Sequence, residues 1–129
     1  MKYNKIIIEE KDFNLLKTII SKSQRYKGKN YYSSIKKLRK ELEYAQILSS
    51  DAIPDDIIRV NSTVTIQMSS NVVRSFQIVT PGTGNVIHDK LSILSPIGLA
   101  VIGYAVNDEI LWQFASGLNK LKILKVMQN

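Results

Sequence analysis

A stretch of twenty residues, 95–114, constrains the fold of this chain more than any other part of its sequence. Ser95 suits the N-cap of a helix, because its hydroxyl can accept a hydrogen bond from a main-chain N–H of the first turn. Pro96 suits the first helical position, where the N–H that proline lacks would have no partner within the helix. Residues 99–102 are apolar on every side, which is typical of a buried helix, and Gly103 suits its end. The stretch therefore predicts a short helix that other elements cover.

Strands are predicted on both sides of this helix. Asn107-Asp108 favours a turn, and residues 110–114 are rich in branched and aromatic side chains, as strands are. Alternating patterns predict further strands at 60–66, 76–80, 90–94 and 121–126, with turns or loops at 69–71, 81–85 and 115–117. Five mostly antiparallel strands with one short helix on a face make an α+β domain, which we place at residues 51–129.

Residues 1–50 have a helical period instead. Residues 5–8 are expected to be extended, and a first helix follows from a cap at Asp12 to about Lys22, with Phe13, Leu16 and Ile20 on one face. Residues 23–30 read as a loop. A second helix is predicted to begin at Ser33 or Ser34. Its apolar seam has the spacing of a coiled coil: Ile35, Leu38, Leu42 and Ala45. Further apolar residues widen this seam near its end: Tyr44, Ile47 and Leu48. We predict an antiparallel two-helix hairpin, a short coiled coil, that forms an arm over residues 1–50.

The positive charge of the chain is confined to this arm. The formal net charge is +7, and residues 1–50 carry all of it, with twelve basic and five acidic residues. Residues 51–129 carry six of each and are neutral. This asymmetry favours an arm that meets nucleic acid or an acidic surface, although a charged face that only contacts solvent gives the same pattern.

Few residues have the chemistry of a catalytic or metal site. The chain has one histidine, His88, and no cysteine, so a thiolate metal site and a disulfide are excluded. The Gly82-Thr83-Gly84 run lacks the Gly-Lys-Ser/Thr ending and the following helix of a phosphate-binding loop. The adjacent acids at 55–56 and 108–109 lie in predicted turns. We therefore expect no enzyme activity, no metal site and no cofactor.

The sequence also predicts where the protein acts. Its first ten residues include only three consecutive apolar residues, which do not make a signal peptide. No run approaches the roughly 18 apolar residues of a membrane span. We expect a cytoplasmic protein that does not contact membranes and is a monomer.

Three segments carry a resemblance to a known family. LSILSPIGLAVIGYAVNDEI at 91–110, IPDDIIRVNSTVTI at 53–66 and LKILKV at 121–126 resemble the C-terminal domain of the bacterial Gre transcript-cleavage factors. The chain looks most similar to their shorter relatives, the regulators of nucleoside diphosphate kinase. This resemblance implies a fold like that of the FKBP-type isomerases and binding to bacterial RNA polymerase. It places Ser95, Pro96 and Ile97 on the surface that engages the polymerase.

The resemblance also implies what the arm does. In Gre factors a long hairpin enters the secondary channel of the polymerase, and two acids at its tip help to hold a metal ion for RNA cleavage. Here no Asp or Glu occurs from Phe13 through Lys40, and the predicted tip is basic and aromatic: Lys22, Arg25, Tyr26, Lys27, Lys29 and Tyr31. Such a tip would repel a divalent cation. We expect a modulator of transcription elongation that docks at the secondary channel and competes with Gre-type factors without stimulating cleavage.

Three alternatives remain open at this point. The hairpin can bind RNA or DNA directly, with charge from Arg25, Lys27 and Lys29 and stacking by Tyr26, Tyr31 and Tyr32. The chain can also be a genuine cleavage factor. The third alternative is that the chain is a prolyl isomerase, because the implied fold is FKBP-like, although a fold does not determine a function.

Overall fold

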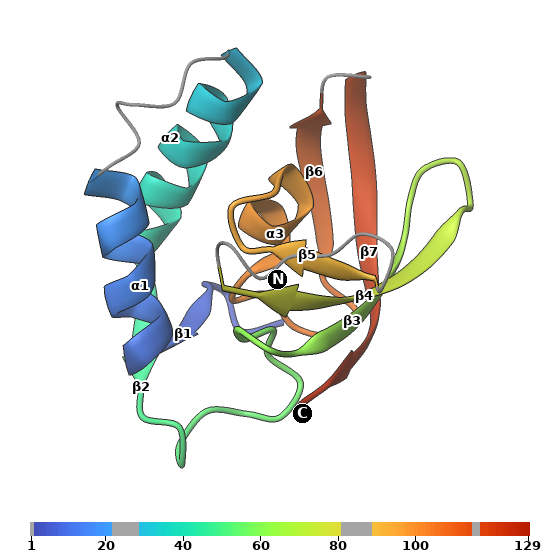
Figure 1. The fold of residues 1–129 in the computed structure, drawn as a ribbon. Helices are drawn as coiled ribbons and strands as arrows, with labels where there is room; N and C mark the ends of the chain where they lie inside the picture. The colour runs from blue at the N-terminus through green and yellow to red at the C-terminus, as the bar shows by residue number, and fades with distance from the viewer. Residues whose placement is uncertain (1, 22–28, 81–88, 115–116) are drawn as a thin grey trace.

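The computed structural model describes residues 2–21, 29–80, 89–114 and 117–129, of which 29–34 and 113–114 are described by their backbone only. Its elements follow the chain in the order shown in Figure 1: β1 (Ile7–Glu9), α1 (Glu10–Ser21), α2 (Lys29–Glu43), β2 (Gln46–Leu48), β3 (Thr63–Gln67), β4 (Val73–Val79), β5 (Lys90–Ser92), α3 (Pro96–Val101), β6 (Glu109–Phe114) and β7 (Gly117–Met127). No described helix is long and apolar enough to cross a membrane.

The predicted five-stranded sheet and its α+β class are confirmed. The strands lie in the order β5-β4-β3-β7-β6, and the pairs β3–β4, β3–β7 and β6–β7 are antiparallel. The pair β4–β5 is parallel, so the sheet is mixed. Alternate residues point inward, as Val64 and Ile66 of β3 do, and the helices cover that face. The opposite face carries exposed residues, among them Leu111 and Leu118.

The helix at the centre of the sequence forms as predicted. The Ser95 hydroxyl accepts a hydrogen bond from the Gly98 N–H at 3.1 Å, and Pro96 is the first helical residue. The C-cap is Ile102, and Gly103 follows it as the predicted stop, with a φ of +83°. Gly98 is also required, because a Cβ there would lie 2.6 Å from the Ser92 carbonyl oxygen.

The predicted turns in the sheet depend on asparagine. Asn71, between β3 and β4, and Asn107, before β6, have φ of 65° and 74°, a region that asparagine tolerates better than most residues. The expected loop at 81–85, His88, and residues 115–116 of the last turn lie outside the described residues.

The second helix differs from its prediction at both ends. It begins at Lys29 and stops at Glu43, so it does not extend toward residue 48. Residues 46–48 instead form β2, which pairs in parallel with β1, and the Gln46 N–H donates to the Ile6 carbonyl at 3.0 Å. The apolar spacing at 45–48 was compatible with a helix, but the main chain of β1 supplies hydrogen-bond partners that a helical pattern does not reveal.

The first helix is also capped differently. The Glu9 carboxylate, not that of Asp12, accepts the hydrogen bonds of the first turn, from the N–H groups of Lys11 at 2.9 Å and Asp12 at 3.2 Å. Asp12 instead accepts from the Val60 N–H at 3.0 Å and joins α1 to the chain before β3. Burial raises the pKa of Asp12, and the bond from Val60 opposes part of that rise.

The described parts of the hairpin share one core with the sheet. Figure 1 shows α1 and α2 running in opposite directions beside α3. Leu16 of α1 and Leu38 of α2 belong to the same buried cluster as Ile66 of β3 and Leu99 of α3. Within the described residues, α2 approaches α3 more extensively than it approaches α1, so the pair is not a free-standing coiled coil. The coiled-coil seam of α2 thus packs into the shared core, where burial of its apolar side chains is favourable.

Candidate functional site

The three residues predicted to engage a partner at the start of α3 are exposed to different degrees. Ser95 is half-buried, and its hydroxyl is used by the helix cap. Pro96 is exposed, whereas Ile97 is half-buried and packs against the core. Ser95 therefore holds the local backbone, and Pro96 presents the surface that another molecule can reach.

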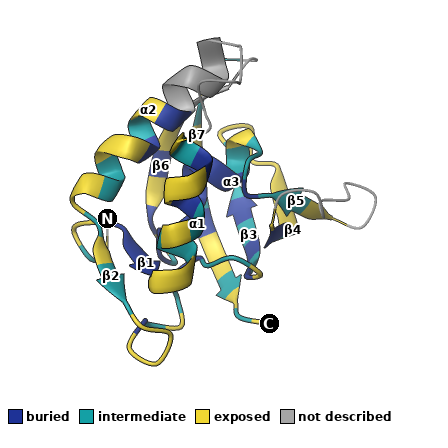
Figure 2. Ribbon diagram, turned by 60° about the vertical axis from the view of Figure 1, so that its left-hand side comes forward, coloured by how far each residue is buried: buried dark blue, intermediate teal, exposed yellow. Residues whose placement is uncertain are grey.

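The predicted basic tip is described only in part. Lys22, Arg25, Tyr26 and Lys27 lie outside the described residues, and Lys29 and Tyr31 are placed by their backbone in the first turns of α2. Figure 1 places the beginning of α2 at the same end of the molecule as the ends of β6 and β7 where these strands meet, and Figure 2 shows the described part of α2 beside β6. The start of α2 thus shares one end of the molecule with part of the sheet.

A polar network that sequence reasoning missed fixes α2 against α3 and β6. The Tyr104 hydroxyl donates to Glu41 at 2.9 Å, and Glu41 also pairs with Lys37. The Lys37 ammonium lies 4.5 Å from the centroid of the Trp112 ring and 5.6 Å from that of Tyr104. Burial, reinforced by Glu41, raises the pKa of Tyr104 far above its usual value, so its hydroxyl remains a donor. The spacing of Lys37 and Glu41 on one helix face was the only sequence signal for this network.

The two acids that flank the acid-free span of the hairpin have structural partners. Asp12 binds the Val60 N–H, and Glu41 binds Tyr104 and Lys37. Both lie toward the end of the hairpin that packs on the sheet, and the helical residues between them in sequence carry no carboxylate. The residues that the structure describes contain no group of three side chains able to hold a metal ion.

One acid of each adjacent pair, Asp56 and Asp108, is also structural. Asp56 accepts from the Tyr3 hydroxyl at 2.9 Å and pairs with the Lys2 ammonium. Partial burial raises the pKa of Asp56, but its bonds to Lys2 and Tyr3 outweigh that effect and lower it. Asp108 is buried and accepts from the N–H groups of Lys2 at 2.6 Å and Ala105 at 2.8 Å. These carboxylates hold the N-terminal segment and the turn before β6.

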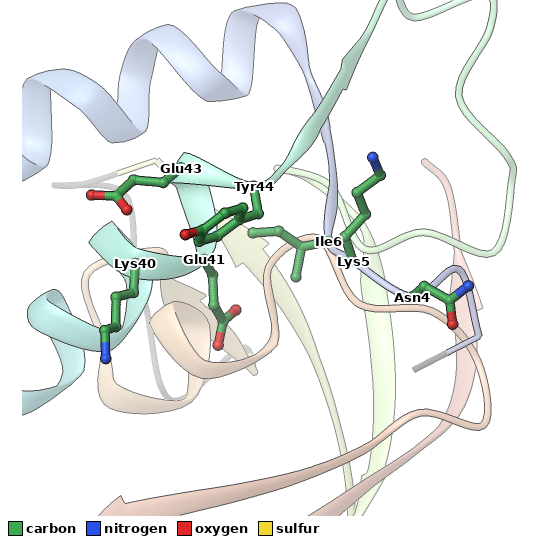
Figure 3. A pocket seen from close by; sticks show the side chains of 7 residues that line it. All are labelled: Asn4, Lys5, Ile6, Lys40, Glu41, Glu43 and Tyr44. Atoms are coloured by element: carbon green, nitrogen blue, oxygen red, sulfur yellow. The ribbon is translucent and has the colours of Figure 1, made fainter.

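A pocket of about 430 Å³ lies where the N-terminal segment meets the end of α2. It is lined by Asn4, Lys5, Ile6, Lys40, Glu41, Glu43 and Tyr44. Figure 3 shows the ammonium groups of Lys5 and Lys40 pointing away from one another, with Tyr44 between them. Because its charged groups do not converge, this pocket has neither the geometry of a phosphate site nor that of a catalytic site.

Comparison with known proteins identifies relatives of the sheet domain and of the whole fold. The sequence model of the C-terminal region of the transcription elongation factors GreA/GreB matches residues 53–128. The chain is 32% identical over 91 residues to the regulator of nucleoside diphosphate kinase of Escherichia coli K12, which is 69% of this chain and 67% of that protein. It is 33% identical over 93 residues to the transcription elongation factor GreA of Streptococcus suis, covering 71% of this chain but 58% of that protein.

Solved structures extend the likeness to the hairpin. A prokaryotic transcription elongation factor GreA/GreB from Nitrosomonas europaea superposes with a TM-score of 0.72 and 27% identity, over 95% of this chain and 98% of that one. Thermus aquaticus Gfh1 has a TM-score of 0.51 at 16% identity and covers the same shares, so it supports the fold alone. The match to the first structure includes the hairpin, which the family model does not reach.

Proposed function

Because this chain belongs to the GreA/GreB family of transcription elongation factors, we propose that it binds bacterial RNA polymerase at the secondary channel. In this proposal the surface around Pro96 docks the sheet domain, and the basic end of the hairpin faces the channel entrance. The protein acts as a monomer in the cytoplasm. It modulates elongation by excluding Gre-type factors from the same site.

The observation that carries this proposal is the absence of acid from the far part of the hairpin. The sequence has no Asp or Glu from Phe13 through Lys40, and Asp12 and Glu41, which flank this span, are bound to protein groups. Metal-assisted hydrolysis needs carboxylates beside the ion, because they neutralise its charge and hold it in place. A hairpin of this composition supports occupation of the channel entrance and not stimulation of RNA cleavage.

The length and packing of the hairpin support binding at the entrance. α1 has 12 residues, or about 18 Å of helix at the usual rise. Leu38 of α2 is buried in the core that the hairpin shares with the sheet, and the Tyr104–Glu41 bond ties α2 to the domain. The described helices of this hairpin are long enough to cover an opening beside the docked domain.

A competition assay tests this proposal. Purified core RNA polymerase is bound to a fluorescent Gre factor, and the full chain is added as competitor at low salt. We expect displacement, and we expect it to weaken when the tip cations are replaced together by Ala: Lys22, Arg25, Lys27 and Lys29. The matched control removes the same charge from the sheet domain: Lys90, Lys120, Lys122 and Lys125. Failure of the intact protein to bind core polymerase would overturn the proposal.

A second pair of variants tests the docking surface. Pro96→Glu places a charge on an exposed residue and should weaken polymerase binding while leaving the unfolding midpoint nearly unchanged. Ser95→Ala removes the helix cap, so it should lower stability by about 1 kcal/mol and affect binding only through that loss. Equal binding by Pro96→Glu and the parent protein would show that the docking surface does not include Pro96.

Direct nucleic-acid binding is the second candidate, because all of the net charge lies in residues 1–50. It predicts binding to naked RNA or DNA whose affinity falls steeply with salt. Polymerase binding that persists after nuclease treatment distinguishes the two candidates. Stimulated cleavage in a stalled elongation complex would show instead that the chain is a cleavage factor.

A further inference from the structure

A groove of about 380 Å³ runs between α1 and α2. Its lining combines apolar side chains of both helices with charged ones: Phe13, Lys17, Ile20, Arg39, Leu42 and Glu43. These residues are separate from Pro96, from the residues of the predicted tip, and from the network around Tyr104. The groove is therefore not among the surfaces that the function proposed above uses.

The groove has an apolar floor because α1 has more apolar surface than the core covers. At about 100° per residue, the apolar side chains of α1 span an arc of about 160°. Leu16 and Ile19, inside this arc, are buried, whereas Phe13 and Ile20, at one margin, remain half-exposed. Leu42 of α2 is also half-exposed, and the two helices approach each other less closely than α2 approaches α3.

Cations line the groove from both helices. Lys17 of α1 and Arg39 of α2 are exposed, and within the described residues neither forms an ion pair. The Lys17 ammonium lies 5.5 Å from the centroid of the Phe13 ring, which places the charge beside the apolar floor. Among the residues that the structure describes, the lining has one acid, Glu43, so the two cations outnumber it. An apolar floor between two cationic rims is complementary to an apolar stripe flanked by carboxylates.

We propose that this groove binds an acidic amphipathic helix of a partner protein. The apolar stripe of that helix packs on Phe13, Ile20 and Leu42, and its flanking carboxylates pair with Lys17 and Arg39. This is the helix-in-groove mode of recognition, with the two helices of the hairpin as its walls. The charge on both rims selects acidic partners, because a basic helix would bring like charges together at each rim.

Fluorescence anisotropy with two designed peptides tests this inference. The first is a labelled 18-residue helix with Leu at the a and d positions of its heptads and Glu at the flanking e and g positions. The second has Lys in place of every Glu. With the full-length chain at low salt, we expect the Glu peptide to bind with a Kd below about 100 μM and the Lys peptide at least about tenfold more weakly.

Charge reversals locate the binding. The double variant Lys17→Glu and Arg39→Glu should weaken binding of the Glu peptide by about tenfold, since two attractive pairs become repulsive. Lys40→Glu is a control for charge reversal outside the groove, because Lys40 is exposed, adjacent in sequence, and lines the pocket of Figure 3 instead. Circular dichroism must show that all variants keep their helix content.

Three results would overturn the inference: equal binding of the two peptides, equal losses from the double variant and Lys40→Glu, or no binding of the Glu peptide up to about 1 mM. A labelled single-stranded DNA that binds in a Lys17- and Arg39-dependent manner, while the Glu peptide does not bind, would assign the groove to nucleic acid and also refute it. The outcome is independent of polymerase competition, because none of these variants alters Pro96 or the tip.

Discussion

The hairpin and the sheet domain are stabilised in different ways. The sheet domain carries its own local signals: the Ser95 cap, the glycine at 98, and asparagine turns at 71 and 107. The hairpin has a helical pattern, but its buried residues Leu16 and Leu38 pack into the core of the sheet domain. Residues 1–50, which contain the hairpin, also carry the whole net charge, whereas residues 51–129 are neutral.

The family of the chain and its proposed activity therefore rest on different regions. The family model matches residues 53–128 and does not reach the hairpin. The hairpin holds the composition on which the proposed activity depends, because it lacks acid from Phe13 through Lys40. The four predictions below test how far the two regions depend on each other.

The largest effect is expected for Leu38→Ala. Leu38 is 1% exposed and belongs to the shared core, so its truncation should lower the free energy of unfolding by about 2–5 kcal/mol. Urea titration followed by Trp112 fluorescence and by far-ultraviolet circular dichroism should give coincident transitions, because both regions unfold together. Two separate transitions would mean that the hairpin unfolds independently, as an arm of residues 1–50 would.

Gly98→Ala tests the sheet domain in the same way. The new Cβ would lie 2.6 Å from the Ser92 carbonyl oxygen and 3.0 Å from the Ile93 Cα, both main-chain atoms. Because α3 must shift away from β5, we expect a loss of about 1–3 kcal/mol by urea denaturation. If α2 relies on α3 for its position, amide exchange in α2 should also accelerate. Unchanged exchange in α2 would show that the two helices are less dependent than their packing indicates.

Tyr104→Phe tests the link between the regions. The variant keeps the ring but removes the hydroxyl that donates to Glu41, and we expect a loss of about 1–2 kcal/mol. Tyr44→Phe is the control, since Tyr44 is 73% exposed and no hydrogen bond is described for its hydroxyl. Thermal unfolding compares the two, and equal midpoints would show that packing alone holds α2 against α3.

Asp12→Asn should have the smallest effect, and it depends on pH. The pKa of Asp12 is raised, chiefly by burial, so the folded protein binds this proton more tightly than the unfolded chain does. The contribution of the wild-type Asp12 to stability therefore falls as pH rises from about 3.9, the usual value for aspartate, through its raised value. Asn keeps an acceptor for the Val60 N–H and does not titrate. Denaturation at several pH values should show that the free energy of unfolding of the variant increases relative to that of the parent protein as pH rises.

The accuracy of the sequence-based predictions depended on how local each signal was. The limits of α3 and the asparagine turns were predicted because capping and left-handed backbone conformations depend on residues a few positions apart. The strand at 46–48 was missed because its partner, β1, lies about forty residues away in sequence. The roles of Glu9 and Asp12 were exchanged because both are acids near the start of one helix, and only the position of Val60 separates them.

The arrangement of the candidate site was not predicted from the sequence. The acid-free part of the hairpin is a fact of composition, and the surface position of Pro96 was implied by the family resemblance alone. The Tyr104–Glu41–Lys37 network joins residues more than sixty positions apart and had only the spacing of Lys37 and Glu41 as a signal. The groove between α1 and α2 could not be predicted, because amphipathic patterns do not say how closely two helices approach.

By itself, the sequence determined the α+β class, the capped helix at 96–101, the neutral sheet domain and the basic hairpin, because these follow from local geometry and from composition. The tertiary structure decided that the hairpin packs into the core of the sheet, that β1 and β2 pair, and that an apolar groove stays open beside Lys17 and Arg39. These features depend on which surfaces, distant in sequence, come into contact. Burial of apolar area is favourable whichever apolar surfaces meet, so a sequence pattern does not specify the partner.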